Sequence, residues 1–460
     1  MKQKFPMKQF LKQIAVIAVP VALQNLLTTT GSMVDTMMLA ALGENTVGAV
    51  GLCAQFSSLM FSCYWGFVGG GMLFFAQYFG AKDDDGINRS YGITLTFMMT
   101  VGFVFCLLGV LLPETVMRLY TDKAVLQEIG ADYLRVVGFA YPLMVYSMAM
   151  ASLLRTTDMV RVPLIGAICS VAVNITLNAV LIPKMGVQGA ATATVAANLV
   201  NVLVILGLGK LKKHAYLTAV REHFRWTRQT VKKYLQKCFP IICNELLIGV
   251  GNMVINIVLG RQPEQAIAAL AVMRTLEGLV IGFFAGFSNA SSVLVGTEVG
   301  AGHPETAYRR ALRLVYLCMA FIALTGCALM AVNHPLLHVM GLHDLSYEYG
   351  FTIVLIYCAA AVIRMGNWTK NDTFRAAGDA TTGTVLEITF MYLMVLPVVC
   401  LSGLVWKWAF PLVFLCCYID EPIRFVIMHI HLYSGKWIRP VTDEGIAAMP
   451  EFRRKLKEKH

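Results

Sequence analysis

The sequence predicts an all-α integral membrane protein, with twelve transmembrane helices arranged as two six-helix bundles. Of its 460 residues, 57% are hydrophobic and only 14% are charged, and the mean hydropathy is +0.65. A soluble domain draws about a quarter of its residues from the charged types, so much of this surface must face lipid rather than water. The other two observations are a series of apolar segments and an internal match between the two halves of the chain. Together they exclude an ordinary soluble enzyme.

Twelve apolar segments are long enough to cross a bilayer, which takes a helix of about 20 residues. They lie at residues 14–42, 47–79, 91–112, 134–154, 163–182, 187–209, 240–260, 266–298, 312–332, 351–374, 383–403 and 408–431. Because twelve is even, both termini are expected on the same side. The polar residues 210–237 divide the segments six and six. We therefore expect an N-terminal six-helix lobe over 1–209, a basic linker over 210–237, a C-terminal six-helix lobe over 238–433 and a cytoplasmic tail over 434–460.

The basic residues predict the orientation. The net charge is +11, and with the N-terminus inside, 29 Lys and Arg residues fall in inner loops against 5 in outer loops. Basic loops resist translocation, so both termini are expected to be cytoplasmic, in the inner (cytoplasmic) membrane of a cell. Charge spread over loops in this way predicts the lipid bilayer, not nucleic acid, as partner. The apolar stretch after Lys12 runs on to Leu42 without a cleavage site, and is expected to be a first span rather than a signal peptide.

The two halves of the chain match each other at a constant offset of 220 residues. The matching pairs are Pro20 with Pro240, Gly31 with Gly251, Gly80-Ala81 with Gly300-Ala301, and Arg155 with Arg375. One offset across four helices indicates duplication of a six-helix unit. Since six is even, both copies enter the membrane from the cytoplasm, so we expect a pseudo-two-fold axis along the membrane normal.

Asp35 is the first-lobe residue for which we most expect an interaction partner or a functional role, because a carboxylate inside a span costs about 2.5–3.5 kcal/mol on insertion. At about 1.5 Å per residue, four polar side chains from three helices fall about 8–14 Å below the outer surface: Asp35, Asn174, Asn178 and Thr194. An oxygen-rich cluster around one carboxylate predicts a binding site for a coupling proton or sodium ion. The alternative is that these polar side chains only satisfy one another in helix packing.

The second lobe departs from this symmetry. Ile255 stands at the position equivalent to Asp35 and is followed by Asn256, while Glu245 enters earlier on the same segment. Glu245 is a secondary candidate for cation binding in this lobe. The alternative is that Glu245 neutralises Arg364 or Arg274.

Further charges in the second lobe favour structural ion pairs. Arg274 and Glu277, three residues apart, share a helical face and belong with Glu245 and Asn256 to the secondary candidate set. Glu387 is also expected to be structural, as is the Asp420-Glu421 pair with Arg424.

A substrate cleft is predicted to use polar and methionine side chains, because a flexible, polarizable surface suits varied ligands. The alternative for the methionines is ordinary core packing. The predicted cleft residues are Gln24, Asn25, Met33, Met37, Gln55, Met60 and Asn244. His334 and His338 have helical metal spacing, but no Cys or Glu accompanies them, so we expect no metal site and no cofactor other than the coupling ion.

Several short motifs resemble the multidrug and toxic compound extrusion (MATE) family of secondary transporters. The resemblance covers about residues 8–440. In the first half it rests on Pro20, Val34-Asp35-Thr36-Met37-Met38, Leu42-Gly43, Gln77-Tyr78-Phe79-Gly80-Ala81, Leu154-Arg155 with Asp158 and Pro163, Asn174-Ile175, and the run from Gly186 to Thr194. In the second half it rests on Val295-Gly296, Gly300-Ala301-Gly302, Arg375 with Gly378-Asp379, and Ser434-Gly435-Lys436-Trp437.

The resemblance implies a V-shaped pair of six-helix bundles that exports organic cations in exchange for inward protons or sodium ions. It implies that Asp35 is the family's first-helix acidic residue, Asn174 its fifth-helix Asn and Thr194 its sixth-helix Thr. Asn178 stands where many members carry Asp, so one carboxylate of the first-lobe site is missing. Glu245 is similar to the seventh-helix Glu of some members, but lies closer to Pro240.

The predicted function is therefore secondary active antiport by a monomer that exports amphipathic organic cations. A lipid-linked oligosaccharide flippase of the same superfamily is the alternative, and it should line its cleft with more basic residues. An enzyme is not expected, because no nucleophile or metal set is recognisable in the spans. A channel is disfavoured, because a buried titratable site in a duplicated two-lobe design suits alternating access better than a continuous pore.

Overall fold

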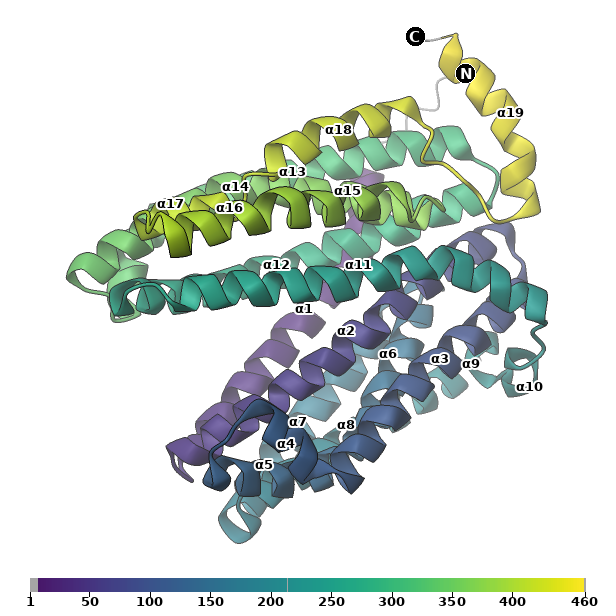
Figure 1. Ribbon diagram of the computed structural model, residues 1–460. Helices are drawn as coiled ribbons and strands as arrows, with labels where there is room; N and C mark the ends of the chain where they lie inside the picture. Colours follow the sequence, from purple (N-terminus) through teal and green to yellow (C-terminus); the bar gives the residue numbers. More distant parts are fainter. Residues whose placement is uncertain (1–6, 213, 459–460) are drawn as a thin grey trace. The chain divides into compact units, whose positions relative to one another are not determined.

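The computed structural model describes residues 7–212 and 214–458, and this part of the chain is helical with no strand (Figure 1). It divides into two compact units. The first lobe comprises the described residues up to Phe75 together with Asp83–Cys238, and the second lobe comprises Ala76–Lys82 with the described residues from Phe239 onward. Of the three boundaries between them, two fall inside the long helices α2 and α11, and the third falls between α2 and α3; the bounds of these helices are given below.

The first lobe contains one long helix for nearly every predicted span. Its elements are α1 (Met7–Ala40), α2 (Glu44–Ala81), α3 (Asp84–Leu111), α4 (Pro113–Tyr120), α5 (Ala124–Val137), α6 (Ala140–Thr156), α7 (Arg161–Met185), α8 (Val187–Leu211), α9 (Ala215–Thr218) and α10 (Val220–His223). Local chemistry sets several ends. The Asp83 side chain caps α3 by accepting from the Gly86 amide at 2.8 Å. Gly186, at φ +61°, separates α7 from α8, a backbone conformation that glycine adopts without strain.

The second lobe repeats the pattern of long helices until its last span. Its elements are α11 (Arg228–Gly260), α12 (Glu264–Gly300), α13 (Pro304–Val339), α14 (Asp344–Ala376), α15 (Thr382–Phe390), η1 (Met391–Val395), α16 (Leu396–Cys400), η2 (Leu401–Val405), α17 (Phe410–Cys416), α18 (Glu421–Ser434) and α19 (Asp443–Lys457). The π-helical turns η1 and η2 lie on either side of Pro397, which has no N–H to give to a regular helix.

Ten of the described helices are long and apolar enough to cross a membrane. The pair α5 and α6, bent by 51°, brings the number to eleven if it is counted as one span, and it covers the predicted segment 134–154. The protein is therefore a multi-pass membrane protein with the predicted all-α fold. The predicted symmetry axis between the lobes stays a prediction.

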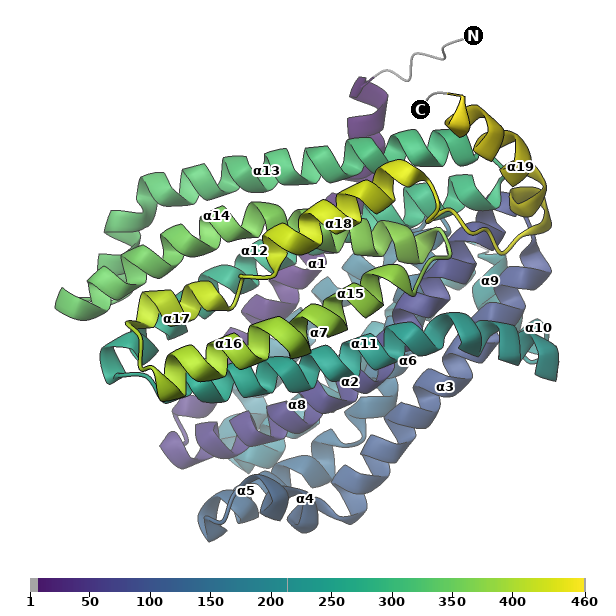
Figure 2. The same cartoon turned by 45° about the horizontal axis from the view of Figure 1, so that its top comes forward.

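The last predicted span, 408–431, differs from expectation because it is split into α17 and α18 (Figure 2). The break falls at residues 417–420, so Asp420 directly precedes α18, which begins with Glu421 and Pro422. Proline is tolerated in the first turn of a helix but cannot continue one, so the chain restarts here. The break places two carboxylates at the beginning of α18, where the partial positive charge of a helix N-terminus favours them.

The residues after the sixth span of each lobe fold back onto that lobe. In the first lobe, His214 Nε2 lies 2.9 Å from the Thr157 hydroxyl, and Gly92 packs directly against the backbone of His223. Burial lowers the pKa of His214 below its ordinary value. In the second lobe, Trp437 is fully buried and the Thr442 hydroxyl donates to the Gly300 carbonyl at 2.9 Å. The linker and the tail are thus packed parts of their lobes.

Asp379 ties the tail to the loop between α14 and α15. Its carboxylate contacts His431 Nε2 at 2.9 Å and Arg439 Nη1 at 3.2 Å, and accepts from the Thr382 hydroxyl at 2.8 Å. Burial alone would raise the pKa of Asp379, but the hydrogen bonds from His431 and Thr382, with the charge of Arg439, hold it below its ordinary value. The ionised form is therefore the one that the folded protein stabilises.

Candidate functional site

The first-lobe site is built where α1 packs on α7. Asp35 lies on α1, and Asn174 and Asn178 lie one turn apart on α7, so both amides face the carboxylate. Asn178 Nδ2 donates to Asp35 Oδ1 at 2.6 Å. In the amide orientation that satisfies its neighbours, Asn174 Nδ2 also donates to Asp35, at 2.6 Å from Oδ1 and 3.2 Å from Oδ2. We call these three residues the Asp35 cluster.

The Asp35 cluster has hydrogen-bond donors but no counter-ion among the residues that the structure describes. Asn174 is 8% exposed and Asn178 only 1%. Within the described part of the chain, no basic side chain pairs with Asp35, and the buried Asn178 Oδ1 has no hydrogen-bond partner. A carboxylate in this position gains from binding a proton or a monovalent cation, because either one neutralises a charge that the membrane interior disfavours.

Thr194 does not contact Asp35 directly. It lies on α8, and its hydroxyl donates to the Ala190 carbonyl at 3.0 Å. Tyr133 on α5 connects the two, because its hydroxyl lies within hydrogen-bonding reach of Thr194 and within electrostatic reach of Asp35. Sequence analysis missed Tyr133, because a tyrosine near the end of a span is usual in membrane proteins and nothing local marks its partner.

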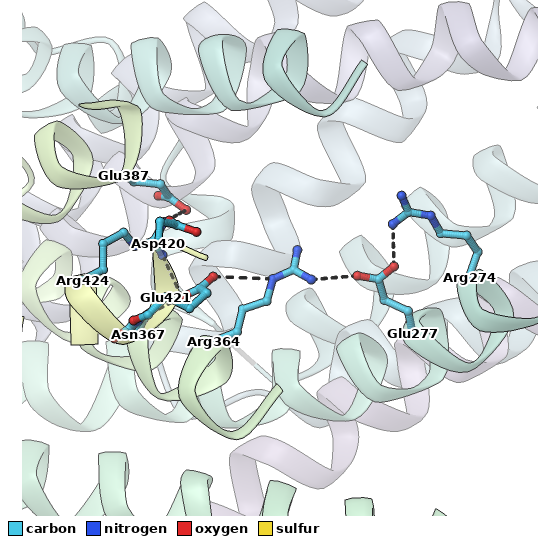
Figure 3. Close-up of polar contacts among 8 residues, drawn as sticks. All are labelled: Arg274, Glu277, Arg364, Asn367, Glu387, Asp420, Glu421 and Arg424. Atoms are coloured by element: carbon cyan, nitrogen blue, oxygen red, sulfur yellow. Dashed lines mark hydrogen bonds and ion pairs between the residues drawn. The ribbon is translucent and has the colours of Figure 1, made fainter. Parts of the chain in front are cut away.

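The second lobe holds a chain of alternating charges, which Figure 3 shows with Arg364 at its centre. Arg274 Nη1 lies 2.6 Å from one Glu277 oxygen, and Arg364 Nη1 lies 2.9 Å from the other. On its other side, Arg364 Nε reaches Glu421 at 4.0 Å. Glu421 in turn contacts Arg424 at 3.4 Å. Each of these two carboxylates is therefore shared by two arginines.

Arg424 is at one end of this series of ion pairs, and three carboxylates lie around it. Asp420 lies at 3.2 Å, Glu421 at 3.4 Å and Glu387 at 3.9 Å. The Oε2 atom of Glu387 also accepts from Asn244 Nδ2 at 3.0 Å and from Asn371 Nδ2 at 3.2 Å. Glu387 and the Asp420-Glu421 pair are thus joined in one network with Arg424. The sequence analysis predicted that these charges are structural, but not that Glu387 shares Arg424 with the other two.

Glu245 pairs with a different arginine from the two that were predicted as its alternative partners. It contacts Arg375 Nη1 at 3.3 Å, and neither Arg364 nor Arg274 is its partner. The reason is that Arg364 and Arg274 are both engaged by Glu277. The remaining secondary candidate, Asn256, accepts from Arg274 Nη2 at 2.8 Å.

A buried lysine was missed by the sequence analysis. Lys370 on α14 is 0% exposed, although its charge was counted with the inner loops. Its Nζ donates to Asn367 Oδ1 and to the Phe425 carbonyl, both at 3.3 Å, and lies 3.4 Å from the centre of the Phe425 ring. Asn367 also donates to Glu421, so Lys370 joins the charged network through one amide.

The seven predicted cleft residues have different surroundings. Gln24 accepts from Arg155 Nη2 at 2.9 Å, and Asn244 donates to Glu387. Asn25 is half-buried. Met33, Met37 and Gln55 are exposed, whereas Met60 is 1% exposed. The assignment of these residues to a substrate cleft stays a prediction.

Comparison with known proteins decides the family. The MatE family model matches residues 20–180 and again 240–401, which together make up more than half of the chain. The chain belongs to the MATE family. The two matches begin 220 residues apart, the offset at which the halves of the sequence repeat.

Relatives and solved structures agree with this family. This MATE protein is 26% identical over 299 residues to the probable multidrug resistance protein YoeA of Bacillus subtilis, covering 63% of this chain and 65%, just under two thirds, of that relative. It is 21% identical to the uncharacterized transporter YisQ of the same organism, covering 88% of this chain and 90% of YisQ. A crystal structure of MATE in complex with MaL6 is similar in fold, with a TM-score of 0.83 at 17% identity, covering 92% of this chain and 97% of that one. The protein is a membrane transporter and not an enzyme.

Proposed function

We propose that this MATE protein is a secondary active antiporter that exports amphipathic organic cations in exchange for inward H⁺ or Na⁺. It would work by alternating access in the cytoplasmic membrane, as a monomer with both termini in the cytoplasm. The observation that carries the proposal is the Asp35 cluster, a carboxylate within a span that has two amide donors and no basic partner among the described residues. Such a group can bind a cation and release it as its surroundings change.

The names of relatives support multidrug export and add a second candidate substrate. Besides YoeA, the chain is 22% identical to the multidrug export protein MepA of Staphylococcus saprophyticus, over 55% of this chain and 57% of that relative. A relative from Shewanella oneidensis, 23% identical over 71% of this chain and 74% of its own length, is an FAD transporter. The substrate test therefore includes FAD beside a lipophilic cation.

A flippase for lipid-linked oligosaccharides is less well supported. It would need basic side chains free to hold a pyrophosphate. Arg274, Arg364 and Arg424 in the second lobe are instead held by carboxylates.

Transport by reconstituted proteoliposomes tests the proposal. A fluorescent lipophilic cation should be transported in the direction opposite to the flow of H⁺ or Na⁺ down an imposed gradient. The ion whose gradient drives this transport is the coupling ion. Empty liposomes and liposomes without a gradient are the controls. If folded protein moves FAD but not the cation, the substrate class is wrong, and if neither gradient drives any flux, antiport is wrong.

A further inference from the structure

The linker between α8 and α11 carries a large positive charge on its surface. Residues 210–237 contain nine Lys and Arg residues but only one acidic residue, Glu222. Glu222 is already paired with Arg225 at 2.8 Å. Arg221, Arg225 and Arg228 are all exposed. An excess of positive charge therefore faces outward from the first lobe.

Large apolar side chains stand among these arginines. Val220 is 60% exposed, Phe224 58% and Trp226 37%. The opposite side of the linker is packed, because Leu217 and His223 are both buried. Aromatic side chains that alternate with basic ones on an exposed surface are typical of segments that lie in the interface between membrane and water. The exposed side of the linker has this composition.

The linker also lies at the right depth, because it runs along the first turns of α3 (Figure 1). The Tyr216 hydroxyl donates to the Asp84 carboxylate at 2.6 Å, where α3 begins. The backbone of His223 packs so closely on Gly92 that no side chain would fit at that position. Eight residues separate Asp84 from Gly92, which is about 12 Å along the helix axis. Since the predicted span begins at residue 91, Phe224 directly follows a residue that lies at the boundary of the hydrocarbon.

We infer that this exposed side of the linker binds anionic phospholipid headgroups of the leaflet next to it. Its residues, which we call the linker surface, are Val220, Arg221, Phe224, Arg225, Trp226 and Arg228. The guanidinium groups match the geometry of phosphate oxygens, and the aromatic rings suit the upper part of the acyl chains. The charge complementarity selects anionic over zwitterionic lipid. The inference involves neither the Asp35 cluster nor a coupling ion, so its failure leaves the antiport proposal standing.

Trp226 serves as the reporter for the test. Full-length protein is placed in bilayer nanodiscs that contain phosphatidylglycerol and phosphatidylcholine, and one of the two lipids carries brominated acyl chains, which quench tryptophan fluorescence on contact. The difference between the parent and Trp226→Phe isolates Trp226 from the other tryptophans of the chain. At low salt and equal mole fraction, brominated phosphatidylglycerol should quench Trp226 more than brominated phosphatidylcholine. The preference should shrink at about 1 M salt, where the Debye length is about 3 Å.

Paired arginine variants test the headgroup contact. Arg221→Gln with Arg228→Gln should reduce the preference for phosphatidylglycerol at least fivefold, because one basic residue near an anionic surface contributes about that factor. Arg118→Gln with Arg261→Gln removes the same charge from two exposed arginines of predicted outer loops, and it should leave the preference unchanged. Equal thermal melting of both double variants and the parent shows that the fold is intact.

Three results would overturn the inference. Equal quenching of Trp226 by both lipids at low salt would mean that the linker surface contacts acyl chains without selecting a headgroup. Absence of quenching by either lipid would mean that water or another protein covers this surface. An equal loss of preference in the control variant would assign the effect to the net charge of the whole protein.

Discussion

The two lobes share one scaffold but place their charges differently. In the first lobe, Asp35 is held by two amides and has no basic partner in the described chain. In the second lobe, the equivalent position is Ile255, which is 6% exposed, and the charges form a network of shared ion pairs. The fold of a six-helix unit is therefore compatible with either an isolated carboxylate or a network of shared ion pairs.

The equivalent arginines make the same point at closer range. Arg155 in the first lobe contacts the amide oxygen of Gln24 at 2.9 Å. Arg375, 220 residues later, contacts the carboxylate of Glu245 at 3.3 Å. The first-lobe arginine thus contacts a neutral amide, whereas the second-lobe arginine contacts a carboxylate. A carboxylate without a basic partner can be neutralised by binding a cation, whereas a carboxylate in an ion pair is already neutralised by its arginine.

The largest expected effect is the loss of transport on removing the isolated acid. Asp35→Asn keeps the shape and hydrogen bonding of the side chain but removes its charge, so no ion can bind the two transport states unequally through it. Ion-driven efflux should fall to the level of empty liposomes. Thermal melting should stay equal or rise, because the insertion cost of about 3 kcal/mol is relieved. If efflux persists in this variant but is lost in Glu245→Gln, the coupling site belongs to the second lobe.

The next effect concerns stability and should be confined to the second lobe. Arg364→Met removes the centre of the charged chain and leaves Glu277 and Glu421 partly uncompensated, which should cost about 3–5 kcal/mol of unfolding free energy. Arg225→Met is the control, because Arg225 pairs with Glu222 on an exposed surface where such a pair contributes at most about 1 kcal/mol. Denaturant unfolding in detergent measures both variants. Equal losses would mean that the second-lobe network is not structural.

A smaller effect is expected on adding a second acid to the first-lobe cluster. Asn178→Asp places another carboxylate beside Asp35, which should strengthen cation binding there by about tenfold, or 1.4 kcal/mol. The measurement is equilibrium Na⁺ binding to the variant and to the parent protein. Weaker binding than in the parent would show that the Asn178 amide is needed as a hydrogen-bond donor.

The smallest effect is a pH-dependent loosening of the tail. Asp379 has its pKa held below the ordinary 3.8 by His431, Thr382 and Arg439 against the opposing effect of burial. Its ionised form therefore contributes stability above pH 3.8, and this contribution is lost as the pH falls through the lower folded value. Asp379→Asn should cost about 1–2 kcal/mol at neutral pH, through loss of charge-assisted hydrogen bonds. The gap to the parent should narrow below pH 4, and a gap that widens there would contradict this role.

The sequence alone predicted the membrane fold, the duplication and the members of the Asp35 cluster. Apolar runs and helical spacing are local properties, and Asn174 and Asn178 share a face because four residues separate them. The depth count then placed them near Asp35, because a helix has a fixed rise per residue. The break between α17 and α18 was not predicted, since the segment is apolar enough to be read as one span.

Only the tertiary structure decided which charges meet. Glu245 contacts an arginine 130 residues away, and Asn244 contacts a carboxylate 143 residues away. Such pairings depend on how helices turn their faces toward one another, and no local spacing encodes that rotation. From the sequence we could predict that burying these charges costs free energy, but not which charges pair. The energy of an ion pair depends on a few ångströms of separation. The two lobes therefore look alike in hydropathy, whereas their packing makes one acid isolated and the others shared.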